Sequence, residues 1–354
     1  MDWVLITSAV LLVAFGLLSI YSSSLGKESF GNFNKQLIFF GIGIFLMFSL
    51  SFFDWRALKD NPYFVLIIYS VLLLALIGLF SSLAPEIRGT KSWYKIGPVL
   101  FDPIEFMKIV IIVILAKYFS SRHIELYRMR HIILSGVYAF LPCLLIFFQP
   151  NLGSALALMV LWIGILLVSG ISVRNFLILM LVFLIIFGLS WQFALKDYQK
   201  ARITSFIYPI DPLGVNWSQN QSKIAIGSGG ILGQGIGKGS QTQYGFLTEP
   251  QTDFIFAAIA EEFGLAGISV LFFLFSILVW KIIKIAIFCQ NNFSRIFAAG
   301  VAILLISEIF INIGMNIGIL PIIGIPLPFI SYGGSSLIVL FAALGIIQNI
   351  KTNL

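Results

Sequence analysis

Apolar runs of about twenty residues recur along this sequence from one end to the other. A helix of that length crosses the roughly 30 Å hydrocarbon core of a bilayer. The runs span residues 3–24, 35–53, 62–83, 104–120, 132–149, 152–170, 175–194, 254–280, 296–318 and 331–350. Lipid cannot satisfy backbone donors and acceptors, so each run must be helical. We therefore expect an all-α, polytopic integral membrane protein with about ten transmembrane helices, in which residues 1–354 form a single transmembrane domain.

The balance of charged and apolar residues supports this class and gives an orientation. With 59% hydrophobic and 10% charged residues, the chain cannot present the polar surface of a soluble domain, and we expect membrane lipids rather than nucleic acid around it. Basic residues in short loops mark the cytoplasmic side. One set of alternate loops holds most of them: Arg56, Lys59, Arg122, Arg128, Arg130, Arg174, Lys281, Lys284 and Arg295. We expect both termini on that side.

Residues 195–252 form a long loop between the seventh and eighth spans, and we expect it on the extracytoplasmic side. Loops of this length are uncommon unless they are functional or disordered. Phe206, Trp217 and Phe246 provide apolar anchors that argue against disorder. The stretch "GSGGILGQGIGKGSQ" matches neither common nucleotide-binding motif. It is either a turn-rich loop or a pocket wall where backbone amides approach an anion.

Several charged residues stand where lipid should exclude them. Glu261 and Glu262 follow the start of the eighth span by two to three turns, and a carboxylate at membrane depth costs at least about 2.5 kcal/mol. In the fourth span, Glu105 and Lys108 are three residues apart, so they share a helix face and can neutralise each other. If they form an isolated pair, losing Glu105 alone should do more harm than losing both. Glu308 in the ninth span has no evident partner.

Helix-breaking residues beside apolar spans point to irregular backbone near a cavity. "FFQPNLGSA" and "GILPIIGIPLPFISYGGSS" combine proline and glycine with polar residues. Such backbone is tolerated at membrane depth only where protein shields it or where it lines a cavity. Ion-coupled transporters use the same interruptions. These features leave a transporter and a membrane enzyme equally open.

The order of four motifs resembles the SEDS family of shape, elongation, division and sporulation proteins. These motifs are "FFQPNLGSA", "QSKIAIGSGGILGQGIGKGSQ", "FLTEPQTDFIFAAIAEEFGLAG" and "GIPLPFISYGGSS". The resemblance covers essentially the whole chain. "SFIYPIDPLG" before the glycine stretch is most similar to the RodA branch rather than to the division protein FtsW.

This resemblance implies a peptidoglycan glycosyltransferase that polymerises lipid II at the outer face of the bacterial cytoplasmic membrane. The essential carboxylate of the family falls on Asp253. A carboxylate there could take the proton of an attacking sugar hydroxyl, while the polyprenyl diphosphate of the donor departs. Glu249, Glu261 and Glu262 would then position or pack the surrounding segment, as would Glu105 and Lys108.

The diphosphate leaving group gives the outer basic residues a candidate role. Binding to its charge or attraction to anionic lipid headgroups is equally open for each of them. These residues are Arg88, Lys91, Lys95, Arg202, Lys223 and Lys238. No cofactor is implied with certainty. A divalent cation, Mg²⁺ or Mn²⁺, could bridge Asp253 and the diphosphate, although no His or Cys spacing indicates a metal site.

The sequence departs from the family pattern at four places, one of which is "FDPIEFMK", where the usual F-Q-P-S-E-x-x-K keeps Glu105 and Lys108 and gains Asp102. The usual Q-P-D-L-G reads "QPNLG", which puts Asn151 at a position that is often acidic. The Arg that commonly precedes the loop tryptophan is Ser92, so Lys91 could replace its charge. The usual F-L-P-E reads "FLTE", which keeps Glu249 and loses a proline.

Two other functions stay open at this stage: a flippase for a lipid-linked precursor, and a non-catalytic scaffold for cell-wall synthesis. The flippase would also need polar groups within the membrane and a groove for an amphiphile, and neither alternative needs to make glycan. The family also works with a class B penicillin-binding protein, whose transpeptidase crosslinks the new strands, so the resemblance implies such a partner here.

Overall fold

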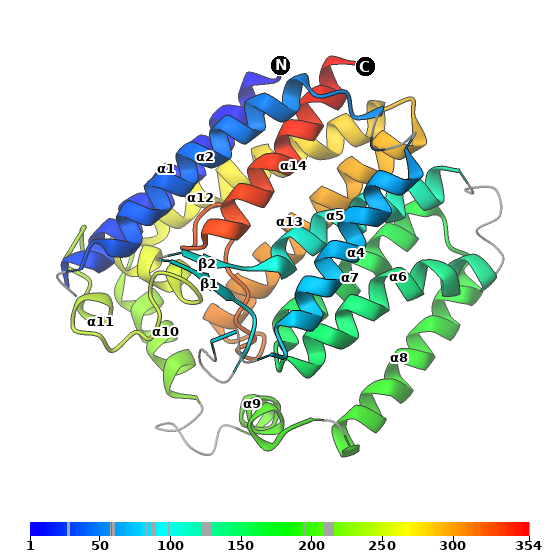
Figure 1. Cartoon of the computed structure of the whole chain (residues 1–354). Coiled ribbons are helices and arrows are strands. Elements are labelled where there is room, and N and C mark those ends of the chain that lie inside the picture. Colours follow the sequence, from blue (N-terminus) through cyan, green and yellow to red (C-terminus); the bar gives the residue numbers. More distant parts are fainter. Residues whose placement is uncertain are drawn as a thin grey trace.

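The computed structural model describes residues 1–26, 29–56, 58, 61–81, 84–85, 90–97, 99–121, 129–193, 195–208 and 216–353. Long helices dominate these residues (Figure 1). The ten that coincide with the expected spans are α1 (Trp3–Leu25), α2 (Gly31–Phe52), α4 (Pro62–Gly78), α5 (Pro103–Ser120), α6 (Met129–Phe148), α7 (Leu152–Ser169), α8 (Val173–Phe193), α12 (Ile255–Phe288), α13 (Asn292–Ile317) and α14 (Gly334–Thr352).

The expectation of a polytopic helical membrane protein is confirmed. Eight of the helices in the described residues are long and apolar enough to cross a membrane. The two other helices at expected spans differ for simple reasons. Helix α4 has only 17 residues, and α5 carries Glu105, Lys108 and Lys117 along its length.

Local sequence explains where several of these helices begin and end. Side-chain oxygens of capping residues accept hydrogen bonds from the first turns of α1, α4, α5, α7 and α13, which satisfies donors that a helix start leaves unpaired. The caps are Asp2, Asn61, Asp102, Asn151 and Asn291. Helices α7 and α13 end at Gly170 and Gly318, both in the left-handed conformation that glycine adopts without strain.

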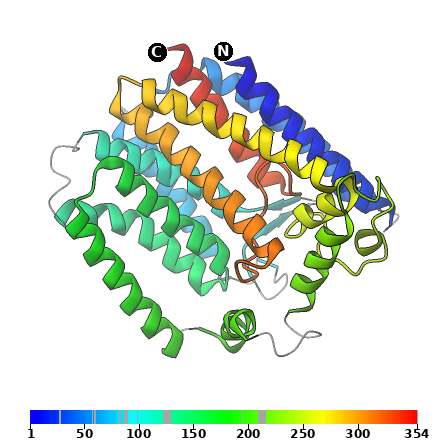
Figure 2. The same cartoon turned by 180° about the vertical axis from the view of Figure 1, so that it is seen from behind.

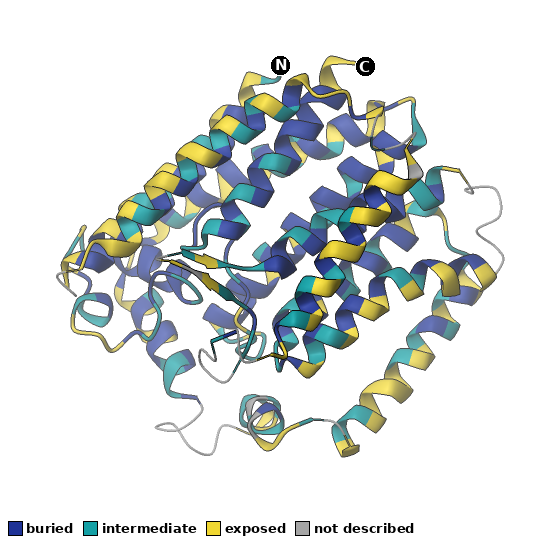
Figure 3. Cartoon of the chain, in the orientation of Figure 1, coloured by how far each residue is buried: buried dark blue, intermediate teal, exposed yellow. Residues whose placement is uncertain are grey.

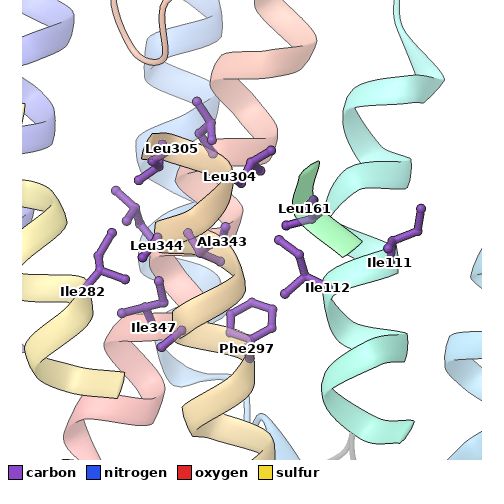
Figure 4. Packing of buried hydrophobic residues seen from close by; sticks show 14 of the residues in the cluster. Ile111, Ile112, Leu161, Ile282, Phe297, Leu304, Leu305, Ala343, Leu344 and Ile347 are labelled. Carbon is purple, nitrogen blue, oxygen red and sulfur yellow. The ribbon is translucent and has the colours of Figure 1, made fainter. Parts of the chain in front are cut away.

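Helix α13 runs through the middle of the bundle. It contacts α5, α7 and α12, while α1 lies along α12 and α2 along α14 (Figures 1 and 2). Ile112 of α5, Leu161 of α7 and Leu344 of α14 reach into the core around α13 (Figure 4). The outward faces of the bundle are largely exposed and apolar, as contact with lipid requires (Figure 3).

Helix α8 stands apart from the rest of the bundle (Figures 1 and 2). Of its 21 residues, only Asn175 and Leu179 are buried. Leu177, Leu184 and Phe193 are among its many exposed apolar side chains. The helix is therefore apolar on nearly every side.

One element departs from the all-α expectation. Strands β1 (Tyr94–Ile96) and β2 (Val99–Phe101) form an antiparallel pair between α4 and α5, in which Tyr94 pairs with Phe101. Its turn includes Gly97 with a φ of 61°. The Tyr94 hydroxyl donates a hydrogen bond to the Ala75 carbonyl of α4 at 2.6 Å. Three-residue strands are too short for their sequence periodicity to stand out among apolar spans.

The described part of the loop 195–252 folds into three helices: α9 (Asp197–Ile207), α10 (Trp217–Ser228) and α11 (Ser240–Gln243). Between α10 and α11, the glycine-rich stretch packs backbone to backbone against α12. The amides of Gln234 and Gly235 donate to the carbonyls of Glu261 and Glu262 at 2.9 and 3.0 Å. This contact accounts for Gly229 and Gly233, because a Cβ at either residue would collide with the α12 backbone.

Helix α12 is not the single straight span that we expected from the sequence. Gly264 has a φ of 63° and a ψ of −162°, which breaks the helix. The rings of Phe256 and Phe272 lie 6.3 Å apart, although sixteen residues of straight helix would separate them by about 24 Å. The first nine residues of α12 therefore fold back against the long part that follows.

We expect Gly233→Ala to destabilise this loop. Gly233 has a φ of 79°, and an added Cβ would meet the Glu262 carbonyl, so the loop must shift. The free energy of unfolding should fall by about 1–3 kcal/mol, measured by thermal unfolding in detergent. Gly227→Ala in α10 is the matched control, because nothing lies within 4 Å of its added Cβ. Equal stability of the two variants would contradict this packing account.

Candidate active site

The segment around Asp253 is a tight turn that leads into α12. Glu249 has a φ of 47°, and its carbonyl accepts hydrogen bonds from the amides of Thr252 and Phe254 at 3.2 and 3.3 Å. A non-glycine residue at positive φ persists only where its surroundings hold it. The turn presents Asp253 immediately before the helix, with its side chain half-buried.

Two membrane helices and the segment before α14 anchor this turn. The Gln251 side chain accepts from Asn32 of α2 at 2.7 Å and donates to Ser24 of α1 at 3.2 Å. The Gln251 carbonyl accepts from the Tyr332 amide at 2.7 Å. The Ser331 hydroxyl donates to the Thr252 carbonyl at 2.7 Å. The turn is thus fixed from several directions.

Two buried asparagines of α13 complete the anchoring. Asn312 and Asn316 both donate to the Asp253 carbonyl, at 3.1 and 3.0 Å. Asn316 also accepts from the Ala257 amide at 3.2 Å and from the Ser222 hydroxyl of α10. We did not predict these residues from the sequence. Their signal was two amides four residues apart in an apolar span, where polar groups are rare and functional.

The Asp253 carboxylate lies against the segment that joins α13 to α14. A Cβ on Gly324 would be 3.6 Å from the Asp253 Oδ2 atom. Beside it, the Thr252 hydroxyl is buried and has no hydrogen-bond partner among the described residues. Ser24 and Asn32 place the turn at the end of α1 opposite the N-terminus, and the 23 residues of α1 span about 34 Å. The arrangement offers a fixed, partly accessible carboxylate that can accept a proton.

Glu261 and Glu262 bind the loop 195–252 at the end of the bundle where Asp253 lies. Glu261 accepts from the amides of Gln241 and Thr242 at 2.7 and 3.0 Å, at the start of α11. Glu262 accepts from Ser22, three residues before the end of α1, and from Gln243 at 3.2 Å. The expected depth of this pair relative to Asp253 is therefore wrong, because the contacts place it near the end of α1 opposite the N-terminus.

Three charged residues form one buried cluster across two helices, which we call the α5–α13 triad. Lys108 Nζ lies 2.7 Å from Glu105 of its own helix and 2.6 Å from Glu308 of α13. Glu105 and Lys108 do meet, but the expectation that Glu308 lacks a partner is wrong. Without Glu105, the lysine would still face Glu308, so the argument from an isolated pair also fails.

Two departures from the family pattern meet in the structure. The Asn151 side chain donates to the Ser92 hydroxyl at 3.0 Å, and its oxygen caps α7 by accepting from the Ser154 amide at 3.2 Å. Ser92 is completely buried. Where the family pattern has Asp and Arg, this chain thus has a neutral hydrogen-bonded pair. Asn151 serves as a helix cap, which an aspartate would also do.

The basic residues that we expected on the outer side are spread over several elements. Lys91 is half-buried beside Ser92, and Lys95 is exposed on β1. Lys223 is exposed on α10 and lies against Gly318 at the end of α13. Lys238 is exposed in the glycine-rich stretch. Arg88 and the side chain of Arg202 lie outside what the structure describes. Lys223 directly follows Ser222, and the Ser222 hydroxyl donates to the Asn316 side chain. Lys223 is therefore next to a residue that contacts the α13 asparagines.

Within the described ranges, no group of three or more His, Cys, Asp and Glu side chains could hold a metal ion. A divalent cation at Asp253 would need oxygens from a substrate to complete its shell, since Mg²⁺ usually keeps few protein ligands.

Comparison with known proteins identifies the family. Residues 2–354 match the cell cycle protein family of FtsW, RodA and SpoVE. The chain belongs to this family. MrdB of Escherichia coli K12, a peptidoglycan glycosyltransferase, is 36% identical over 97% of this chain and 91% of its own length. Stage V sporulation protein E of Bacillus subtilis is 35% identical over 99% of this chain and 96% of its own length.

Solved structures of similar chains have the same fold as this chain. A chain from a peptidoglycan synthase complex, studied for how polymerization and crosslinking are coordinated, superimposes with a TM-score of 0.84 at 28% identity, covering 99% of this chain and 98% of that one. The rod shape determining protein RodA of Thermus thermophilus gives a TM-score of 0.74 at 26% identity, covering 99% and 97%.

Proposed function

We propose that this chain is a peptidoglycan glycosyltransferase that polymerises lipid II into glycan strands during cell elongation, with Asp253 as the general base. Family membership and the similarity to MrdB support the reaction. The similarity to RodA supports the role in elongation. The observation that carries the proposal is the anchored turn that presents the half-buried Asp253 carboxylate at the end of the bundle away from the termini.

The chemistry requires one carboxylate in that place. The 4-hydroxyl oxygen of one sugar attacks the anomeric carbon of the other, and the bond from that carbon to the diphosphate oxygen breaks. Asp253 takes the hydroxyl proton, and the diphosphate leaves with the bonding electron pair. Because diphosphate is a good leaving group, a second carboxyl acting as an acid is not needed. A single displacement inverts the anomeric configuration, from an α-linked donor to a β-linked polymer.

The orientation follows from the termini. Both lie at one end of the molecule, away from α10 and α11 (Figure 1). The basic residues of the short loops favour that end as cytoplasmic. In this orientation, Asp253 and the described part of the loop 195–252 are extracytoplasmic. The donor lipid and the growing strand would meet there in the cytoplasmic membrane of a bacterium.

Among the basic residues, Lys223 is our first candidate for binding the diphosphate. We expect Lys223→Gln to weaken lipid II binding by about tenfold, the effect of one charge-assisted hydrogen bond. Lys238→Gln is the matched control, because Lys238 lies in the glycine-rich stretch and not beside the α13 end. Binding of fluorescent lipid II to the purified proteins measures both. Equal affinities would assign Lys223 to headgroup attraction instead.

We propose a divalent cation only as an ion that the chain shares with the diphosphate of the substrate. Asp253 could share Mg²⁺ or Mn²⁺ with the diphosphate oxygens, and the cation would neutralise charge on the leaving group. Polymerisation in the presence and absence of a chelator, with each metal added back, tests this dependence.

The partner that we propose is a class B penicillin-binding protein, which would crosslink the strands that this chain makes. The similar chain from a peptidoglycan synthase complex supports this assignment. Purified chain with lipid II, assayed with and without that partner, separates the three functions. A polymerase makes glycan in at least one arm. A flippase moves fluorescent lipid II across liposomes without making glycan, and a scaffold does neither.

A further inference from the structure

A polar hollow of about 300 Å³ lies at the end of the molecule that carries both termini. It is bordered by the segment after α2, the connection between α12 and α13, and the end of α14. Trp55, Arg56, Ser294 and Asn353 are among its lining residues. In the orientation proposed above, this is the cytoplasmic face. Asp253 is at the opposite end, so the catalytic proposal does not use this hollow.

Two buried polar atoms that lack a hydrogen bond belong to residues that line this hollow. They are the indole nitrogen of Trp55 and the hydroxyl of Ser294, and neither has a partner among the described residues. Trp55 is 6% exposed and Ser294 is 2% exposed. Burying an unpaired polar group is unfavourable, so each such group in a folded protein requires an explanation.

The Trp55 side chain is held in a fixed position. Its ring stacks on Phe293 with centroids 5.6 Å apart and an angle of 8° between the planes. Its backbone amide donates to the Asn349 side chain of α14 at 3.4 Å. The indole N–H can only donate. A ligand that satisfies it must therefore present an acceptor.

The surrounding charge and backbone favour an anion. Ser294 is the third residue of α13, a helix of 26 residues whose N-terminus carries partial positive charge. Arg56 lines the hollow, and its guanidinium lies 3.9 Å from the exposed carboxylate of Asp54. Burial raises the pKa of the Cys289 thiol to about 11, while Arg295 and Lys351 act in the opposite direction, so both cations are near this lining residue.

We infer that this hollow binds a phosphate group through Trp55, Ser294 and Arg56. An indole N–H, a hydroxyl and a guanidinium beside a helix N-terminus together match a phosphate that offers several acceptor oxygens. Exposed apolar side chains, Ile287 and Phe288, lie directly before Cys289 and place the hollow beside lipid. The phosphate could belong to an anionic phospholipid headgroup or to a soluble phosphate monoester.

Two probes distinguish these sources. Glycerol 3-phosphate is titrated against the purified full-length chain, and binding is followed as a rise in melting temperature. Retention of phosphatidylglycerol is measured by native mass spectrometry. Trp55→Phe combined with Ser294→Ala removes both donors and keeps the aromatic stack. We expect the double variant to bind the probe at least about tenfold more weakly than the wild type, because hydrogen bonds to a charged group are lost.

The matched controls are Trp280→Phe, at an exposed tryptophan of α12, and Ser307→Ala, whose hydroxyl is already bonded to the Leu304 carbonyl at 2.9 Å. Both should bind like the wild type. If the double variant does not fold, Arg56→Gln at an exposed side chain takes its place and should weaken binding without lowering stability. Response to glycerol 3-phosphate supports a soluble ligand, and selective loss of phosphatidylglycerol supports a lipid. If neither probe binds the wild type, or if pocket and control variants bind equally, the inference is wrong.

Discussion

We expect Lys108→Met to lower the free energy of unfolding by about 3–5 kcal/mol, the effect of breaking a buried ion pair by removing one partner. The lysine ammonium lies 2.7 Å from Glu105 and 2.6 Å from Glu308, and all three side chains are buried. Without it, two carboxylates would face each other inside the bundle between α5 and α13. Thermal unfolding and the yield of monodisperse protein in detergent measure the loss.

Single removal of either carboxylate should be milder, because the lysine keeps its other partner. Glu105→Gln leaves the contact with Glu308, and Glu308→Gln leaves the contact with Glu105. Changing all three residues to neutral ones should recover part of the stability that Lys108→Met loses, since no isolated charge remains. If Lys108→Met melts with the wild type, the triad does not hold α5 against α13.

The second large effect concerns chemistry and not folding. Asp253→Asn keeps the size and shape of the side chain but removes its basicity, so lipid II polymerisation should fall by about 10²–10⁴-fold. The turn should survive, because Asn312 and Asn316 bind the backbone carbonyl of residue 253 and not its side chain. We therefore expect unchanged melting temperature and lipid II binding in the same preparation. A folded variant with full activity would remove Asp253 from the mechanism.

The neighbouring acid Glu261 supplies the control for that experiment. Glu261 accepts two backbone amides and the Thr242 hydroxyl, and an amide at this position would turn a donor toward other donors. Glu261→Gln should therefore lower stability, while each folded molecule still polymerises lipid II. Loss of turnover without loss of stability would instead bring Glu261 into the chemistry.

Features with a local cause could be predicted from the sequence. Apolar length located the spans, and spacing within one helix brought Glu105 and Lys108 together. The contact between Glu308 and Lys108 was missed because the two residues are two hundred positions apart in the sequence. Periodicity carries no information about which helices are in contact. The contact between Ser92 and Asn151 was missed for the same reason, although both were noted as departures from the family pattern.

The break in α12 shows a different limit. Gly264 lies inside an apolar run that also contains ordinary helical glycines such as Gly267. Its positive φ arises from tertiary contact, because the amides of Leu265 and Ala266 bond to the carbonyls of Gly230 and Ile231 in the glycine-rich stretch. The sequence does not show that the glycine-rich stretch packs against this helix. We therefore expected a straight helix, which placed Glu261 and Glu262 too deep.

Glycan synthesis from purified components shows directly whether this chain itself joins sugars. Purified wild-type protein and its Asp253→Asn variant are incubated with lipid II, and the length of the glycan strands is followed over time on a gel. We expect β-linked strands from the wild type and, at matched amounts of folded protein, at least about a hundredfold less product from the variant. Strands of equal length and yield from both proteins, or none from the wild type even with its penicillin-binding protein partner, would contradict it.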